Sequence, residues 1–350
     1  MVVQAQASLV HKGTEVSRCD EPRPVDEMSD GNSLLVPPVP AGPERPLWSV
    51  LIPTWNCARY LEEALLSVLA QDRGIEKMEI IVVDDHSTRD DPEEVVDRLG
   101  GARVKFVRQK SNVGKVRNYE SGLLLSRGTL IHQLHGDDKV LPGFYEAMEH
   151  AFTGFPEAGA FFCESYYIDE RSKVTGRTGS ELPETGLLGD WLETIVVGQR
   201  MQTPSVVLKR STYEALGGFD RRLDLFEDWE MWIRVASRYP VGFLPGALAE
   251  YRSFDGNTTA VSKDHARTLR RLFTIVDAYL PAELLKKKYR ERNSAQAQYF
   301  LQLIPKLVAS GRIGEVAKAY RDALSFSRDP KTFYRILNYT FNYRELLNAR

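Results

Sequence analysis

The sequence predicts an α/β protein whose mainly parallel β-sheet is flanked by helices. Short apolar runs alternate with stretches of helical periodicity from residue 48 to residue 134, which is the rhythm of strand–helix–strand units. The chain has 350 residues, of which 43% are hydrophobic, and this is enough for a substantial core. Polar and acidic residues follow several apolar runs. Because ligands of such sheets bind beyond the carboxyl ends of the strands, we expect a ligand crevice at that edge.

The first half of the chain carries the clearest elements. Its expected strands are short and rich in Val, Ile and Leu, and its expected helices place apolar residues on one face. We expect strands over residues 50–52, 80–83, 104–107 and 129–134, and helices over residues 61–69 and 115–126. After Pro142 the alternation is less regular. There we expect strands over residues 161–163 and 205–208, a loop or hairpin over residues 166–179, and a helix over residues 228–237.

The composition divides the chain into three parts. Residues 1–46 hold seven prolines and few large apolar residues, so we expect a disordered tail that cannot offset the entropy cost of ordering. Residues 47–264 carry the pattern of the α/β domain. Residues 265–350 are predicted to form a basic helical appendage, with helices over residues 269–279, 295–308, 313–324 and 333–347.

The bulk charge and the cysteines exclude several classes of protein. The formal net charge is -2 and the isoelectric point is near 6.4, so we expect no nucleic-acid partner. Three widely separated cysteines (Cys19, Cys57 and Cys163) indicate neither a disulfide framework nor a zinc site, and this favours a reducing compartment. The sequence contains no run of about eighteen apolar residues and no secretory signal pattern. We therefore expect a soluble, cytoplasmic protein.

The end of the chain is basic. From Glu283 onward there are 14 lysines and arginines against 6 acidic residues, which gives a formal charge of +8. Basic helices rich in aromatic residues can bind anionic membrane surfaces or acidic partners. A solvated helical face with an ordinary excess of charge explains the same composition. The sequence leaves both interpretations open, and peripheral membrane contact through the basic C-terminal helices is one of them.

Two adjacent carboxylates, Asp137 and Asp138, follow the strand expected over residues 129–134. Neighbouring side chains of a strand point to opposite faces, so the two can serve one ligand only where the strand has ended and the backbone turns. Such a pair can hold a divalent cation with one carboxylate and a ligand hydroxyl with the other. An Asp-Asp turn that only caps the next segment is the simpler explanation, and the pair alone does not decide between the two.

Four further segments stand in a consistent order around this pair. They are Val50-Leu51-Ile52-Pro53-Thr54-Trp55-Asn56, Val82-Val83-Asp84-Asp85-His86-Ser87-Thr88, Asn112-Val113-Gly114-Lys115-Val116-Arg117-Asn118 and Glu227-Asp228-Trp229-Glu230. Together with His135-Gly136-Asp137-Asp138, they resemble the family 2 glycosyltransferases of the GT-A fold over roughly residues 48–262. The resemblance implies a GT-A domain over residues 47–264 with a Rossmann-like mixed, mostly parallel sheet. It also implies transfer of a sugar from a nucleoside diphosphate sugar to a hydroxyl acceptor such as a glycan, a lipid carrier or a small molecule.

The resemblance implies that several of these segments build a nucleotide pocket. Pro53, Thr54 and Asn56 would contact the base and ribose, or would only shape the turn after the first strand. Asp85 would accept a hydrogen bond from a ring N–H of the nucleobase, a task suited to a carboxylate that only accepts. Arg117 would help to hold the nucleotide or its diphosphate, and a surface ion pair is the alternative explanation for it.

The resemblance gives the two neighbouring carboxylates different roles. Asp137 would bind hydroxyls of the ribose or sugar, and Asp138 would coordinate a cation that bridges both phosphates, with Mn²⁺ or Mg²⁺ suited to oxygen ligands. Two departures from the family pattern leave the identity and affinity of the metal open. His135 stands where many relatives carry a third Asp, and no His closely follows the Tyr251-Arg252 pair, where relatives often have one.

Asp228 is the candidate base. In the inverting enzymes that the chain resembles, the Asp of the Glu-Asp pair accepts the proton of the acceptor hydroxyl as that oxygen attacks the anomeric carbon. Such assistance contributes about 10²- to 10⁴-fold in rate. In the alternative interpretation, Glu227 and Asp228 only favour the start of a helix. The alternative function is a catalytically silent module that binds a nucleotide sugar or docks a partner, and the presence of Asp137, Asp138 and Asp228 argues against it.

Overall fold

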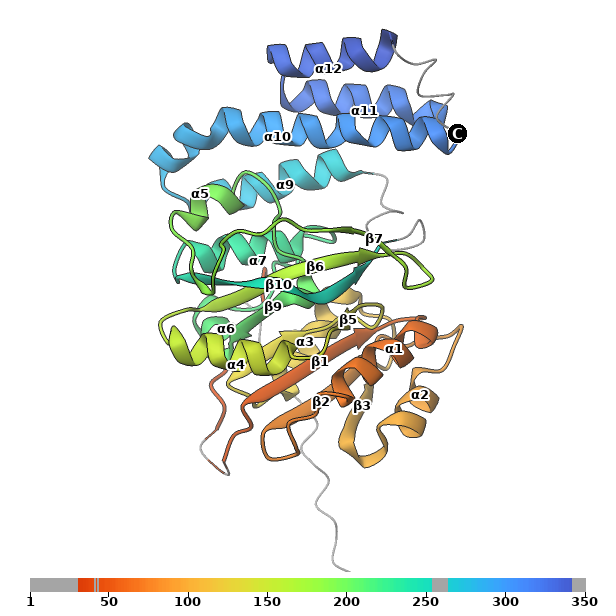
Figure 1. Cartoon of the computed structure of the whole chain (residues 1–350), viewed down its shortest axis with the longest axis vertical. Helices are drawn as coiled ribbons and strands as arrows, with labels where there is room; N and C mark the ends of the chain where they lie inside the picture. Colours follow the sequence, from red (N-terminus) through yellow and green to blue (C-terminus); the bar gives the residue numbers. More distant parts are fainter. Residues whose placement is uncertain (1–30, 41, 43, 254–263, 342–350) are drawn as a thin grey trace, which may run out of the picture.

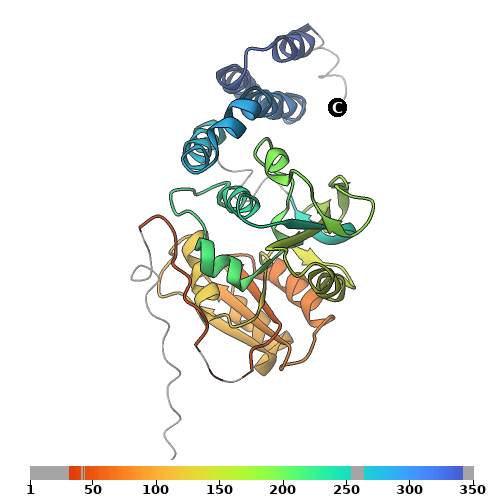
Figure 2. The same ribbon diagram turned by 90° about the vertical axis from the view of Figure 1, so that its left-hand side faces the viewer.

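A ten-stranded sheet forms the centre of the computed structural model, which describes residues 31–40, 42, 44–253 and 264–341 (Figures 1 and 2). The strands are β1 (Trp48–Thr54), β2 (Met78–Asp84), β3 (Val104–Arg108), β4 (Leu130–Gln133), β5 (Lys139–Val140), β6 (Ala160–Ile168), β7 (Val174–Arg177), β8 (Gly186–Leu187), β9 (Val206–Lys209) and β10 (Val241–Arg252). Eight of them follow the order β3-β2-β1-β4-β9-β6-β10-β5, while β7 pairs with β6 and β8 with β10.

The first half of the sheet is parallel. β2 pairs in parallel with β1 and β3, and β1 pairs in parallel with β4. β9 then runs antiparallel to both β4 and β6, and β6 is again parallel to β10. Because β1, β2 and β4 run in the same direction, their last residues Thr54, Asp84 and Gln133 lie at one edge of the sheet. The predicted α/β class with a mixed sheet is confirmed.

Helices cover both faces of the sheet, and the helices after residue 264 stack beyond those of one face (Figure 1). They are α1 (Ala58–Leu69), α2 (Pro92–Leu99), α3 (Lys115–Leu125), α4 (Phe144–Gly154), α5 (Trp191–Ile195), α6 (Arg210–Leu216), α7 (Glu227–Ala236), α9 (His265–Asp277), α10 (Ala282–Ala309), α11 (Ile313–Phe326) and α12 (Pro330–Phe341). Alternate residues of β1 point to opposite faces, so Val50 and Leu51 enter different cores. One core includes Leu65 of α1, and the other includes Leu123 of α3 and Trp232 of α7.

β10 is a strand that the sequence pattern does not predict. Its middle contains Pro245 and Gly246, a pair that usually marks a turn. The pairing of β10 with β6 shifts register in this region, and Gly246 has a φ of +105°. The Pro-Gly pair therefore forms a bulge instead of ending the strand. As a result β10 continues to Arg252, whose backbone N–H donates to Asp138 in the loop between β4 and β5, residues 134–138, hereafter the acidic loop.

The predicted helical character of the region after residue 264 is confirmed, and Figure 1 shows its helices stacked beyond α7. Phe273 of α9 meets Trp229 of α7 with 5.8 Å between ring centroids. Buried residues of α9 and α10 belong to the same core as α7, so the core of the domain continues into this region. The last expected helix, 333–347, extends into residues 342–350, outside the described part. No helix among the described residues is long and apolar enough to span a bilayer.

Part of the expected tail packs on the domain. Residues 1–30 lie outside the described part, but Leu34 and Val36 are buried in the core that contains α3 and α6. The Gly218 N–H donates to the Leu34 carbonyl over 2.8 Å, which ties the segment to the loop after α6. The prediction of a disordered tail is therefore wrong for the stretch around Leu34, because its two apolar side chains find a place in the core.

Candidate active site

The loop after β4 lies against the carboxyl end of β1. The Gly136 N–H donates to the Pro53 carbonyl (3.0 Å), and a Cβ added to Gly136 would come within 3.0 Å of Thr54 Oγ1. A side chain at residue 136 would press against Thr54 and Cys57, so glycine suits this close approach. Thr54 is buried, and its hydroxyl lies 3.0 Å from Cys57 Sγ. Pro53 and Thr54 thus support the acidic loop, and their contact with base and ribose stays a prediction.

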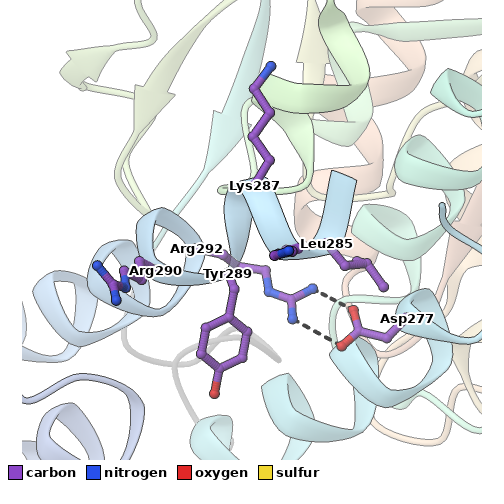
Figure 3. A pocket seen from close by; sticks show the side chains of 7 residues that line it. Asp277, Leu285, Lys287, Tyr289, Arg290 and Arg292 are labelled. Atoms are coloured by element: carbon purple, nitrogen blue, oxygen red, sulfur yellow. Dashed lines mark hydrogen bonds and ion pairs between the residues drawn. The ribbon is translucent and has the colours of Figure 1, made fainter. Parts of the chain in front are cut away.

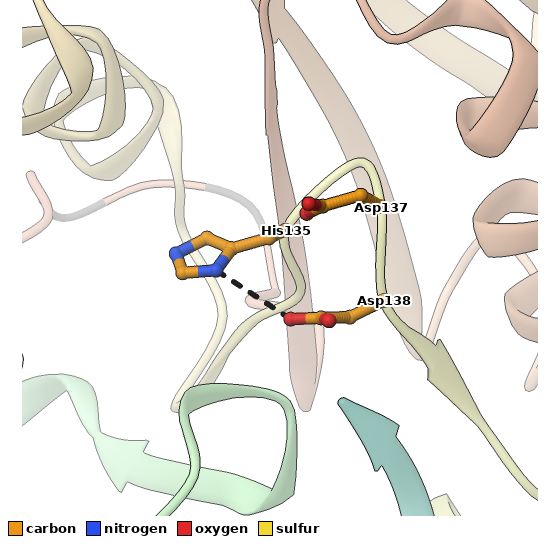
Figure 4. A group of neighbouring side chains, drawn as sticks. All are labelled: His135, Asp137 and Asp138. Carbon is orange, nitrogen blue, oxygen red and sulfur yellow. Dashed lines mark ion pairs between the residues drawn. The ribbon is translucent and has the colours of Figure 1, made fainter. Parts of the chain in front are cut away.

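Figure 4 shows His135, Asp137 and Asp138 gathered in this loop, where one ligand atom from each lies within 4.8 Å of the others. His135 Nδ1 is 3.5 Å from Asp138 Oδ2. Asp138 Oδ1 accepts the backbone N–H of Arg252 (2.8 Å), while its buried Oδ2 receives no hydrogen bond from the described residues. A buried carboxylate oxygen without a donor, beside two further ligand atoms, fits a divalent cation.

The three side chains influence each other's protonation. Burial raises the pKa of Asp137 to about 6, and the neighbouring charge of Asp138 adds to this effect. Burial lowers the pKa of His135, but the neighbouring carboxylates of Asp138 and Asp137 raise it, and the net pKa lies above the usual value. Two carboxylates side by side disfavour each other's ionised form. A bound cation would stabilise both negative charges.

Asp85, directly after β2, holds the loop that leads into α3. Its two carboxylate oxygens accept the backbone N–H groups of Val113 (2.6 Å) and Gly114 (2.9 Å). Burial raises the pKa of Asp85, although these two hydrogen bonds act in the opposite direction. Each oxygen retains a second lone pair. The contact of Asp85 with a nucleobase N–H is thus chemically open and stays a prediction.

Asn56 uses its side-chain oxygen within the protein. Its Oδ1 accepts the backbone N–H groups of Thr88 (2.9 Å) and Arg89 (3.0 Å). The backbone N–H of Asn56 donates to Ser87 Oγ. These bonds join the loop after β1 to the loop after β2. The turn-shaping interpretation thus has direct support for Asn56, and only its side-chain NH₂ group is left for a base or ribose.

The structure adds Lys115, which the sequence analysis did not select. It is the first residue of α3, and its Nζ lies 2.8 Å from Oε1 of the buried Glu227. Burial lowers the pKa of Lys115, but Glu227 and then Asp228 raise it, so the net pKa is above normal. A cation at a helix N-terminus opposes the helix dipole. A lysine at the start of an expected helix is therefore unusual, and this feature of the sequence could have identified Lys115 as a functional candidate. Arg117 lies exposed on the same turn of α3.

Asp228 lies in the first turn of α7. Its Oδ2 accepts the hydroxyl of the buried Thr203 (3.1 Å), and its Oδ1 accepts the backbone N–H of Trp229 (2.7 Å). Burial and the charge of Glu227 raise the pKa of Asp228, while Lys115 and the two hydrogen bonds lower it. Asp228 is therefore a fixed carboxylate that is more basic than a solvated one.

Lys115 lies near two of the segments that carry predicted site residues, the acidic loop and α7. Its charge acts on the pKa of both His135 and Asp228, so the acidic loop and α7 both lie near it. Gly114, its neighbour, is held by Asp85. Asp85 after β2 and Glu227 of α7 thus contact the N-terminus of α3, and the acidic loop after β4 lies near it. This arrangement can hold a cation and an anionic ligand beside a separate basic carboxylate.

Comparisons with known proteins agree with this fold and site. Residues 49–204 match the model of the glycosyl transferase family 2. An uncharacterized protein of Mycobacterium tuberculosis is 29% identical over 246 residues, which are 67% of this chain and 74% of that protein. An uncharacterized glycosyltransferase of Rickettsia typhi is 28% identical over 221 residues, which are 61% of this chain but only 66% of that protein.

Solved structures share the fold. TarS of S. aureus in complex with UDP-GlcNAc has a TM-score of 0.57 at 16% identity, covering 85% of this chain and 91% of the other. The mannosyltransferase PcManGT from Pyrobaculum calidifontis, in complex with GDP-Man and Mn²⁺, has a TM-score of 0.53 at 19% identity, covering 89% and 86%. Both likenesses confirm the expected GT-A fold. The family match and the related glycosyltransferase show that residues 49–204 form a family 2 glycosyltransferase domain.

Proposed function

We propose that this chain is an inverting glycosyltransferase that moves a sugar from a nucleoside diphosphate sugar to a hydroxyl acceptor, with Asp228 as general base. The observation that carries the proposal is the ion pair of Lys115 with Glu227, beside Asp228, because the charge of Lys115 also acts on His135 in the acidic loop. Inversion by direct displacement needs a base on one side of the sugar and a site for the leaving diphosphate on the other. A basic carboxylate on α7 and a separate acidic loop after β4 suit that requirement.

Asp228 acts on the acceptor. As the acceptor oxygen bonds to the anomeric carbon, Asp228 takes the proton of that hydroxyl, and the bond from the carbon to the diphosphate oxygen breaks with its electron pair leaving on the diphosphate. The hydrogen bonds from Thr203 and the Trp229 N–H orient the carboxylate. Its raised pKa makes it a better proton acceptor at neutral pH, provided that it is still ionised there.

In this proposal the acidic loop lies on the side of the sugar where the diphosphate leaves. Asp138 would bind the divalent cation through its buried Oδ2, with His135 beside it, and Asp137 would bind hydroxyls of the ribose or sugar. When bound, the cation stabilises the charge that develops on the departing diphosphate. Carboxylates suit both Mg²⁺ and Mn²⁺, whereas an imidazole ligand suits transition metals better. The donor set therefore favours Mn²⁺.

The donor is a nucleoside diphosphate sugar in this proposal. The two structural neighbours were solved with UDP-GlcNAc and with GDP-Man, which supports this class of ligand. Asp85, Pro53, Thr54 and Asn56 would line the base and ribose, and Arg117 would approach the phosphates. The acceptor is a hydroxyl of a glycan, a lipid carrier or a small molecule.

The test is release of nucleoside diphosphate from a panel of nucleotide sugars with Mn²⁺, read together with donor binding by thermal shift. We expect the wild-type chain to release nucleoside diphosphate from one donor. Asp228→Asn should lower transfer by about 10²-fold or more, because the amide cannot take the proton, while the donor still raises the melting temperature. Asp190→Asn is the matched control, since Asp190 is an exposed carboxylate at the start of α5.

The catalytically silent module makes the opposite prediction. A silent chain binds a donor tightly yet releases no nucleoside diphosphate with any acceptor, and Asp228→Asn then changes nothing. Transfer that survives Asp228→Asn at the wild-type rate contradicts the role of Asp228. The same assay without added metal, in a chelator, tests the cation separately.

For the basic appendage we propose contact with an anionic membrane surface from the cytoplasm. Residues of α10, among them Lys286, Lys287, Tyr289 and Arg290, line a hollow of about 560 Å³, and Figure 3 shows several of these side chains. Asp277, the acidic residue in this hollow, is already bound by Arg292 over 2.6 and 3.0 Å. Lys286 and Arg290 form no ion pair within the described residues. The hollow therefore has uncompensated positive charge, which complements anionic headgroups.

A further inference from the structure

Arg252, the last residue of β10, is a buried arginine whose side chain is used by several segments at once. It is 1% exposed. Its guanidinium donates to the carbonyls of Asp137 (2.8 Å) and Asp169 (2.9 Å), to Ser172 Oγ (3.0 Å) and to Glu63 Oε2 (3.1 Å). The guanidinium also lies over the ring of Tyr60, 4.4 Å from its centroid. One side chain thus connects the acidic loop with α1 and with the turn between β6 and β7.

The backbone of Arg252 holds the acidic loop a second time. Its N–H donates to Asp138 Oδ1 (2.8 Å), while its Nε donates to the carbonyl of Asp137. Because Oδ1 of Asp138 is occupied, the other oxygen is left facing His135 Nδ1 at 3.5 Å. The main chain of residue 252 therefore holds Asp138, and the guanidinium of Arg252 holds the carbonyl of the neighbouring Asp137.

The cost of burying this charge indicates that its position matters. A buried arginine destabilises a fold unless its donors are satisfied, and the donors of Arg252 bind four acceptors from remote parts of the chain. The planar guanidinium can serve several acceptors in fixed directions, which a lysine cannot do. Glu63, one of those acceptors, is shared with Lys139 (3.3 Å), so the network continues to β5.

We propose that Arg252 is a positioning residue that fixes the Asp137–Asp138 loop in the geometry that binds the cation and the diphosphate. This inference rests on the proposed function. It assigns to Arg252 no contact with substrate. Residues that orient metal ligands typically contribute 10- to 100-fold to metal affinity, which sets the size of the expected effect.

The experiment compares Arg252→Met with Arg210→Met. Arg210 is an equally buried arginine, 2% exposed, that donates to the Leu123 carbonyl and to Ser126 Oγ, among residues away from the acidic loop. Two quantities are measured in the full chain. Hydrogen exchange of the peptide over residues 134–139 reports the loop itself, and electron paramagnetic resonance reports Mn²⁺ binding, alone and with UDP.

We expect Arg252→Met to speed exchange of the 134–139 peptide more than that of β1 and β2, and to weaken Mn²⁺ binding by about 10- to 100-fold. Arg210→Met should leave both unchanged relative to the rest of the sheet. Arg252→Lys, which keeps the charge, should show most of the loss. If Arg252→Met does not fold, Arg252→Lys and Glu63→Gln decide the question.

The outcomes separate this inference from the proposed function. Wild-type Mn²⁺ affinity and loop exchange in Arg252→Met, or in both milder variants, overturn the positioning role. Full rescue by Arg252→Lys also overturns it, because charge alone would then suffice. If the wild-type chain binds no Mn²⁺, the metal part of the proposed function fails, and the exchange data still report whether Arg252 orders the loop.

Discussion

Lys115 tunes the charge of Asp228. Burial raises the pKa of Asp228 and Glu227 raises it further, while Lys115 is the largest influence in the opposite direction. Only the ionised carboxylate accepts a proton, so kcat/KM should fall as the pH drops through this raised pKa. The acid limb should therefore lie at higher pH than a solvated Asp would give. Lys115→Met removes the opposing charge, and the limb should move to still higher pH.

The pH dependence of kcat/KM for wild type and Lys115→Met checks this prediction. Lys110→Met is the control, because Lys110 is exposed and its charge is not among the causes of the Asp228 shift. An acid limb that stays in place in Lys115→Met means that Asp228 is not the group that titrates. A change in KM alone, with the limb unmoved, assigns Lys115 to donor binding.

The places of the acidic candidate residues in the fold could be predicted from the sequence, whereas their hydrogen-bond partners could not. Asp85, Asp137, Asp138 and Asp228 each follow an apolar run or begin a helical one, and such positions indicate a crevice at the edge of a sheet. Thr203 has no such signal. It comes to Asp228 through the fold, from a short turn before β9 that lies 25 residues earlier in the chain.

Among the structural elements, the segment around Leu34 shows that the packed domain extends toward the N-terminus beyond β1. Leu34 is fully buried, and its neighbour Leu35 is 56% exposed. We expect Leu34→Ala to lower the free energy of unfolding by about 2–5 kcal/mol, because it removes buried contacts and leaves a cavity. Leu35→Ala should change it by less than about 0.5 kcal/mol. Urea unfolding of the two variants measures both, and equal values would contradict the packed position of Leu34.

Some structural elements were not predicted, and the reasons lie in their local sequences. Most strands and helices were predicted because their apolar residues recur at the period of the element, as in α1 and β2. β10 was missed since Pro245 and Gly246 usually end a strand, and only the pairing with β6 shows that they form a bulge. The packing of Leu34 was missed because the prolines dominate the composition of that segment.

At the scale of the whole molecule, the site depends on contacts between remote segments. Arg252 binds residues that are 80 to 189 positions away, and Lys115 pairs with Glu227. Local periodicity carries no information about such pairs, so the sequence alone could indicate candidate residues but not their partners. The family resemblance supplied the order of the motifs, and the structure supplied Lys115, Thr203 and Arg252.

The positive charge of the chain is concentrated in its C-terminal helices. The hollow on α10 should bind vesicles that contain phosphatidylglycerol but not neutral phosphatidylcholine vesicles, and salt should weaken the binding. Each basic residue near an anionic surface contributes about 1 kcal/mol, so Lys286→Gln with Arg290→Gln should lower the affinity roughly thirtyfold in flotation assays. Lys105→Gln with Lys110→Gln removes the same charge from β3 and its following loop and should have little effect. Equal losses in both double variants would indicate attraction to net charge, and no salt-sensitive flotation of the wild-type chain would exclude membrane contact through α10.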